Sequence, residues 1–129
     1  MSLDITLRMP FNMDRIVVKN NEVVMPLSGS MEDLGVVVYD TNITHNCHVM
    51  AEAAGLGILW DGDDYVGLTA FVLIPYLIQG IEKMKASPAT YGRLEPSNGW
   101  GTLSQFLRFT EELLIKCSMY PQAEISISR

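Results

Sequence analysis

Basic residues are scarce in this chain: nine Lys and Arg residues stand against fifteen Asp and Glu residues, which gives a formal net charge of −6 at pH 7. The few basic residues are also scattered singly along the sequence. Binding to nucleic acid needs a cluster of cations that displaces counterions from the phosphates. The sequence therefore predicts no nucleic-acid partner.

Long hydrophobic runs are absent as well. The most apolar run, residues 66–78, contains Pro75 and is shorter than the ~20 residues that a helix needs to cross a bilayer. The first residues alternate polar and apolar side chains and include Asp4 and Arg8, unlike a secretory signal peptide. We therefore expect no membrane association and a cytoplasmic location.

Cysteine is equally sparse, because Cys47 and Cys117 are the only two. Both fall on the apolar stripes of predicted helices, where a free thiol behaves as a small hydrophobic side chain. We expect both thiols to be reduced and buried. A disulfide between the two helices is the alternative.

The motifs of common catalytic sites are missing too. The sequence contains no G-x-S-x-G, no H-E-x-x-H and no glycine-rich phosphate loop after a strand. No activated nucleophile is therefore indicated. Whether the protein is an enzyme stays open, and a non-enzymatic role is favoured.

The length and apolar content indicate one compact domain. A chain of 129 residues suits a single domain spanning residues 1–129, with a strand and a hairpin in residues 1–34 and the core in residues 35–129. A hydrophobic fraction of 48% with only 19% charged residues is high for a small monomer. A homo-oligomer that covers apolar surface is therefore predicted.

The pattern of polar and apolar residues predicts an α+β fold, with an antiparallel or mixed sheet of about five strands and three helices packed on it. Asn20-Asn21 suits a tight hairpin turn, and Thr102 and Gln105 form a capping-box pair. Pro75 predicts either a kink or a helix start close to it. The expected strands are residues 4–9, 15–19, 22–25, 35–39 and 124–129, and the expected helices are 43–54, 67–85 and 103–119.

Both histidines fall on the first predicted helix. If that helix starts near Ile43, then His45, His48 and Glu52 lie within about 60° of each other on its polar face. These side chains, with Asp40 just before the helix, could ligate a divalent transition metal and serve a small metal-dependent hydrolase. The alternative is that they form an ordinary solvated helix face.

Several short blocks resemble a small family of uncharacterised proteins from bacteriophages, prophages and bacteria. The blocks are Asn-Ile-Thr-His-Asn at 42–46, Leu-Trp at 59–60, Asn-Gly-Trp-Gly-Thr at 98–102 and the last residues, 121–129. The resemblance covers roughly residues 36–129 and implies a phage or mobile-element setting, but it implies no activity. The residues that match best are Thr44, His45, Asn46, Asn98, Trp100 and Arg129. His48 has no counterpart in the pattern.

The leading hypothesis is a binding or interaction module without a cofactor. His45, Asn46, Asn98 and Trp100 would line a pocket for a small polar ligand or a loop of a protein partner. Imidazole and carboxamide groups supply hydrogen-bond donors and acceptors, and the indole supplies a flat apolar wall. Alternatively, the two asparagines cap backbone groups and Trp100 fills the core.

Overall fold

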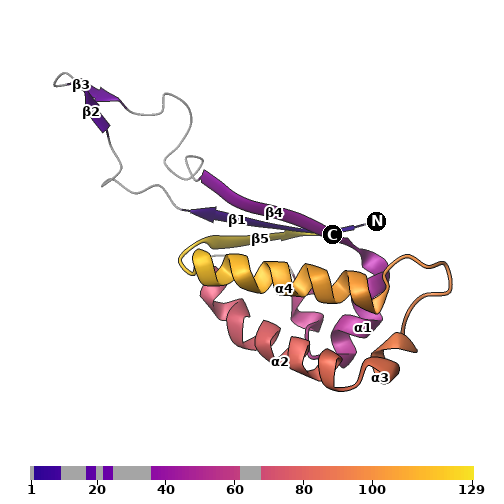
Figure 1. Ribbon diagram of the computed structural model, residues 1–129. Coiled ribbons are helices and arrows are strands. Elements are labelled where there is room, and N and C mark those ends of the chain that lie inside the picture. Colours follow the sequence, from indigo (N-terminus) through magenta and orange to yellow (C-terminus); the bar gives the residue numbers. More distant parts are fainter. Residues whose placement is uncertain (1, 10–16, 20–21, 25–35, 62–67) are drawn as a thin grey trace.

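The computed structural model describes residues 2–9, 17–19, 22–24, 36–61 and 68–129 (Figure 1). The strands are β1 (Ser2–Met9), β2 (Val17–Lys19), β3 (Glu22–Val24), β4 (Val36–Thr44) and β5 (Glu124–Ser128). The helices are α1 (His48–Ala53), α2 (Leu73–Ala86), α3 (Pro88–Gly92) and α4 (Leu103–Met119). Short 3₁₀ turns cover His45–Cys47, Gly57–Trp60 and Ala70–Val72. The predicted α+β class is confirmed.

The sheet differs from the expectation, because it has three strands in the order β4-β1-β5 and not five. All its pairings are antiparallel. β2 and β3 form the predicted hairpin as a separate two-stranded sheet, while its Asn20-Asn21 turn lies outside the described residues. β2 and β3 are three residues long each and pair with each other, while the central place between β4 and β5 is taken by β1.

Helices α1 to α4 all lie on one face of the three-stranded sheet (Figure 1). Alternate residues of β1 point into this layer, and Leu3, Ile5 and Leu7 are fully buried there. The opposite face of the sheet carries polar cross-strand pairs such as Asp4 with Asn42 and Thr6 with Asp40. The result is a two-layer structure with one covered and one polar sheet face.

The first predicted helix begins later than expected. Residues 41–44 continue strand β4, where Thr44 pairs with Ser2 and Ile43 pairs with Leu3. This long-range pairing overrides the helical spacing of the apolar residues. A 3₁₀ turn then leads into α1, which begins at His48 and covers only six residues.

The other helices agree better with the sequence. The prediction for α4 is confirmed at both ends, and its capping box is formed by Thr102 and Gln105. The expected range 67–85 was too long at its start, because α2 begins at Leu73 and Thr69 forms a β-bridge with Glu124. Pro75 lies in the first turn of α2, which confirms the predicted helix start near it. Pro88 does more than end α2, because it occupies the first turn of the short, unpredicted helix α3. Within the described ranges, no helix combines the length and apolar composition of a membrane span.

Gly80 of α2 lies where the chain between α1 and α2 crosses close to it. A Cβ atom at this position would lie 2.6 Å from Leu56 Cδ1, and Leu56 is fully buried. We expect Gly80→Ala to lower the free energy of unfolding by about 1–2 kcal/mol, although alanine is the better helix former. Urea denaturation of the variant measures the change.

Gly92→Ala is the matched control, since no atom lies within 4 Å of the Cβ it would add. We expect this variant to be as stable as the parent or up to about 1 kcal/mol more stable. If Gly80→Ala behaved in the same way, the close approach of Leu56 to α2 would be wrong.

Candidate functional site

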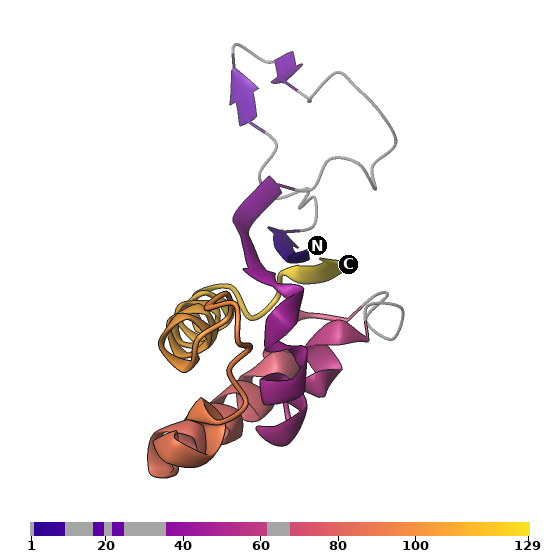
Figure 2. The same ribbon diagram turned by 90° about the vertical axis from the view of Figure 1, so that its right-hand side faces the viewer.

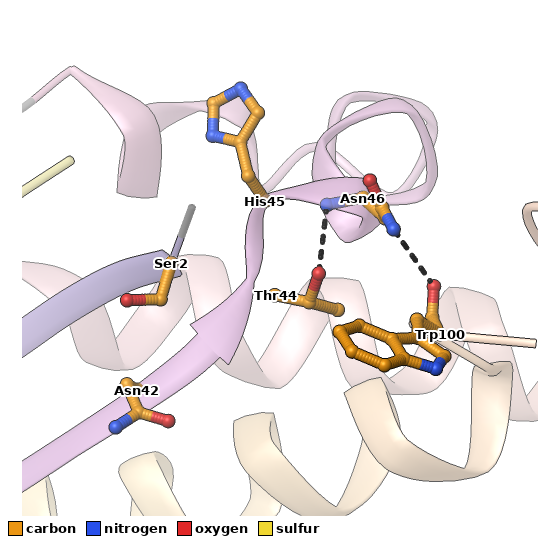
Figure 3. Close-up of a pocket in the computed structure, with 6 residues that line it drawn as sticks. All are labelled: Ser2, Asn42, Thr44, His45, Asn46 and Trp100. Carbon is orange, nitrogen blue, oxygen red and sulfur yellow. Dashed lines mark hydrogen bonds between the residues drawn. The ribbon is translucent and has the colours of Figure 1, made fainter.

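An open hollow of about 630 Å³ lies where β4 ends and the chain turns toward α1 (Figure 3). Its lining comes from three separate parts of the sequence: the start of β1, residues 42–46 and the loop before α4. The lining residues are Ser2, Asn42, Thr44, His45, Asn46 and Trp100. Three of the four predicted site residues, His45, Asn46 and Trp100, therefore share one hollow.

Residues 44–46 form a tight turn that joins this hollow to the loop before α4. The Asn46 backbone N–H donates to Thr44 Oγ1 at 3.4 Å, which ends the strand. The Asn46 side-chain Nδ2 donates to the backbone carbonyl of Trp100 at 3.4 Å (Figure 3). No described residue donates to the Asn46 side-chain oxygen, so this atom is available as an acceptor.

Asn98 does not line the hollow. Its Oδ1 accepts the backbone N–H of Trp100 at 3.0 Å, which makes it a turn residue. Gly99 and Gly101, on either side of Trp100, have φ angles of 75° and 97°, which glycine adopts without strain. The backbone of Trp100 is thus held at both its N–H and its carbonyl, while 70% of the residue's surface is exposed.

Gly101 brings the loop against the end of β4. A Cβ atom at this position would lie 3.1 Å from both Cys47 Sγ and Thr44 Cγ2. Beyond it, the side-chain oxygen of Gln105 accepts the N–H groups of Gly101 and Thr102. The backbone N–H of Leu103, the first residue of α4, donates to Glu95 Oε1 at 2.8 Å. These amide groups are therefore occupied by the chain's own side chains.

His45 also contacts the hydrophobic core, through a hydrogen bond from Trp60. Trp60 is fully buried, and its Nε1–H donates to His45 Nδ1 at 3.0 Å. The neutral imidazole must then carry its proton on Nε2. His48 stacks on the same indole at a centroid distance of 5.1 Å, with the two planes 15° apart. His45 thus supports Trp60 through one nitrogen and has Nε2–H left as a donor.

The alternative metal site finds no support in the geometry. His48 Nε2 lies 3.1 Å from Glu52 Oε1, and the His45 and His48 rings are 5.6 Å apart, so the predicted neighbours do meet. Asp40, however, lies on β4 and accepts a 3.4 Å hydrogen bond from Thr6. Among the residues that the structure covers, no group of three His, Cys, Asp or Glu side chains could hold a metal ion.

Both cysteines are free and buried, as predicted. Burial raises the pKa of the Cys47 thiol to about 11 and that of the Cys117 thiol to about 12. Both thiols are therefore protonated at neutral pH. Neither is suited to act as a nucleophile.

The hollow offers both hydrogen-bonding groups and an apolar surface. Asn42 and Asn46 supply carboxamide groups, His45 supplies an N–H donor and Trp100 supplies an indole face. Sequence reasoning gave Asn42 no role in the pocket and missed Ser2 altogether. Asn42 could have been found if the strand had been extended to Thr44, because Asp40, Asn42 and Thr44 then alternate on one face. Ser2 reaches the hollow only through the β1–β4 pairing.

Arg129, which the family resemblance singles out, follows β5 and is exposed. It does not line the hollow. Comparisons of the chain with models of protein families, with curated proteins and with solved structures found no match, so the resemblance to a phage family stays a prediction.

Proposed function

We propose that this protein is a non-enzymatic binding module, whose hollow at the end of β4 takes a polar ligand or an exposed segment of a partner protein. The observation that carries this proposal is the convergence of His45, Asn46 and Trp100 on one open hollow. The family resemblance adds the expectation of a phage or prophage setting. Self-association also stays a prediction.

The state of Trp100 supports binding. The exposed indole offers a large apolar surface that a ligand in the hollow can cover. The backbone of Trp100 is nevertheless fixed by Asn98 and Asn46, so the loop that presents it is ordered before any ligand arrives. A pre-positioned aromatic side chain loses little conformational entropy on binding.

The chemistry of the site favours binding over catalysis. Nδ1 of His45 is engaged by Trp60, and no hydroxyl or thiol of the described residues is paired with either histidine in a nucleophile–base arrangement. The two thiols are buried and protonated. What the site presents instead is a set of neutral hydrogen-bonding groups around an indole.

We expect Trp100→Ala to abolish binding at the hollow while changing the free energy of unfolding by no more than about 0.5 kcal/mol, since the side chain is largely exposed. The measurement is an NMR screen of the ¹⁵N-labelled protein against amino acids, nucleosides, sugars and short peptides. Compounds that bind should shift the Trp100 indole N–H and the Asn46 side-chain amide together.

Phe71→Ala provides the control. Phe71 is 65% exposed, and its backbone N–H donates to Pro121 beyond the far end of α4, away from Trp100. This variant should bind as the parent does. The proposal fails if no compound shifts the Trp100 and Asn46 signals, or if shifts seen in the parent persist in Trp100→Ala.

A further inference from the structure

We propose that the ligand of this hollow is an extended peptide segment with basic side chains, which adds to β4 as a fourth strand of the sheet. This inference rests on the proposed function and names the class of partner. It follows from the edge of β4, the shape of the space beside it and the charge around it.

The outer edge of β4 is unpaired in the described structure. β4 has nine residues and is the last strand on its side of the sheet. Within the described ranges, no backbone hydrogen bond from a loop, turn or helix end reaches it. Every second residue of such a strand presents its N–H and C=O groups outward, which is the arrangement that an added strand needs.

The register shift between β4 and β1 falls between Val37 and Tyr39, so the edge of β4 is regular from Tyr39 to Thr44. Val36 to Thr44 contains neither Lys nor Pro, the residues that commonly protect an edge strand from pairing. Most of its residues are β-branched and favour extended backbone. Val36 and Val37 at its start are each exposed over about half of their surface.

A second hollow of about 420 Å³ follows this edge. It is lined by Asn42, Ile43 and Thr44 of β4 and by Trp100, Gly101 and Gln105. Successive strand residues point to opposite faces of a sheet, so a space that touches three in a row lies along the strand's edge. The two hollows share Asn42, Thr44 and Trp100, which makes them neighbours along the end of β4.

Helix α4 supplies the other wall. Figure 2 shows α4 on the same side of the molecule as β4, with β5 across the sheet. Lys116 of α4 lies over the ring of Tyr39 of β4, with Nζ 5.8 Å from the ring centroid. A strand added to β4 would therefore have the edge of the sheet on one flank, and Trp100 and the start of α4 on the other.

The charged groups around the two hollows favour a peptide with basic side chains. Neither hollow is lined by Lys or Arg, and a cation already placed beside β4, Lys116, lies over the Tyr39 ring. Two carboxylates flank Asn42 on the polar sheet face: Asp4 is its cross-strand partner and Asp40 lies two residues before it. The exposed Trp100 indole can also hold a Lys or Arg side chain over its face. A second copy of the chain would bring a further charge of −6, which opposes pairing between copies.

The test starts from random heptapeptides displayed on phage and selected against the full chain, with Trp100→Ala in a parallel selection. We expect peptides rich in Lys or Arg to be enriched on the parent and on Phe71→Ala, but not on Trp100→Ala. The best peptide is then synthesised with N-methyl groups on alternate residues, in each of the two possible registers. Methylation in one register removes the bonds to β4 and should weaken binding about tenfold or more, while the other should have little effect.

Hydrogen exchange of the β4 backbone amides distinguishes a peptide that binds as an added strand from a ligand that binds in another way. Bound peptide should slow exchange at alternate residues of 39–44, the part of β4 beyond the register shift. If a peptide or a small compound shifts the Trp100 and Asn46 signals without slowing these amides, strand addition is wrong and the proposed function stands. If no peptide is enriched, or acidic peptides are, the inference also fails. Slow exchange without peptide, together with a dimer in sedimentation equilibrium, would assign the edge to a second copy instead.

Discussion

Replacing His45 by alanine is expected to lower the free energy of unfolding by about 2–3 kcal/mol. Trp60 is fully buried and its Nε1–H donates to His45 Nδ1, so the variant leaves a buried donor without its partner, which costs about 1–3 kcal/mol. The change also removes the imidazole from its contacts with the rings of His48 and Trp60. Urea or thermal unfolding measures the difference.

Two further variants separate the hydrogen bond from the loss of the ring. His45→Asn places a carboxamide oxygen near the position of Nδ1, so it should recover part of the lost stability. Trp60→Phe removes the donor, and in that background His45→Ala should cost clearly less than in the parent. If the two changes were simply additive, His45 and Trp60 would not be coupled.

His45 lines the hollow and also accepts a hydrogen bond from Trp60 in the core, so a substitution at His45 changes both binding and stability. A loss of binding in His45→Ala would mix the loss of Nε2–H with movement of the turn that presents Asn46. Trp100 does not have this difficulty, because most of its surface is exposed and its backbone is held by other residues. Binding is therefore best tested at Trp100, and the link between the hollow and the core at His45.

The sequence predicted best what is decided locally. Helix α4 was predicted at both ends because the signals for it are local: the capping box lies at its start, and Pro121, which cannot continue a helix, follows two residues after its end. The first predicted helix was right about its buried side, since Cys47, Met50, Ala51 and Ala54, which stand at helical spacing, are buried, while Ile43 lies on β4. Its start was wrong because the same residues that fit a helix also fit a strand, and pairing with β1 decided between them.

In the candidate site, too, residues with a local signal were predicted, and residues placed by long-range contacts were missed. Residue chemistry and the family resemblance pointed to His45, Asn46 and Trp100, which do share a hollow. Asn98 is in the right loop, but its carboxamide binds its own backbone. Ser2 lines the first hollow only because β1 pairs with β4. Gln105 lines the second hollow only because α4 packs beside β4. Such long-range contacts leave no local pattern in a single sequence.

The buried thiols carry the largest expected effect, a loss of stability in alkaline solution. The pKa is about 11 for Cys47 and about 12 for Cys117 in the folded chain, against 9.0 for a free thiol. Because the folded-state values are raised, the contribution of the two thiols to stability is fully present below pH 9 and is lost as the pH rises toward 11 and 12. At pH 11 the loss is about 2 kcal/mol for Cys47 and about 3 kcal/mol for Cys117.

A loss of about 5 kcal/mol is a large part of the stability of a small domain, so the parent should be strongly destabilised near pH 11 at room temperature. Comparison of the parent with Cys117→Ala isolates the contribution of this thiol from that of every other group. At pH 8 this variant should be less stable than the parent, because a buried side chain is shortened. Since alanine has no proton to lose, its deficit should shrink by about 3 kcal/mol between pH 8 and pH 11. Urea titrations of both proteins at the two pH values measure this change, and a deficit that stayed constant would show that burial does not hold the Cys117 thiol in its protonated form.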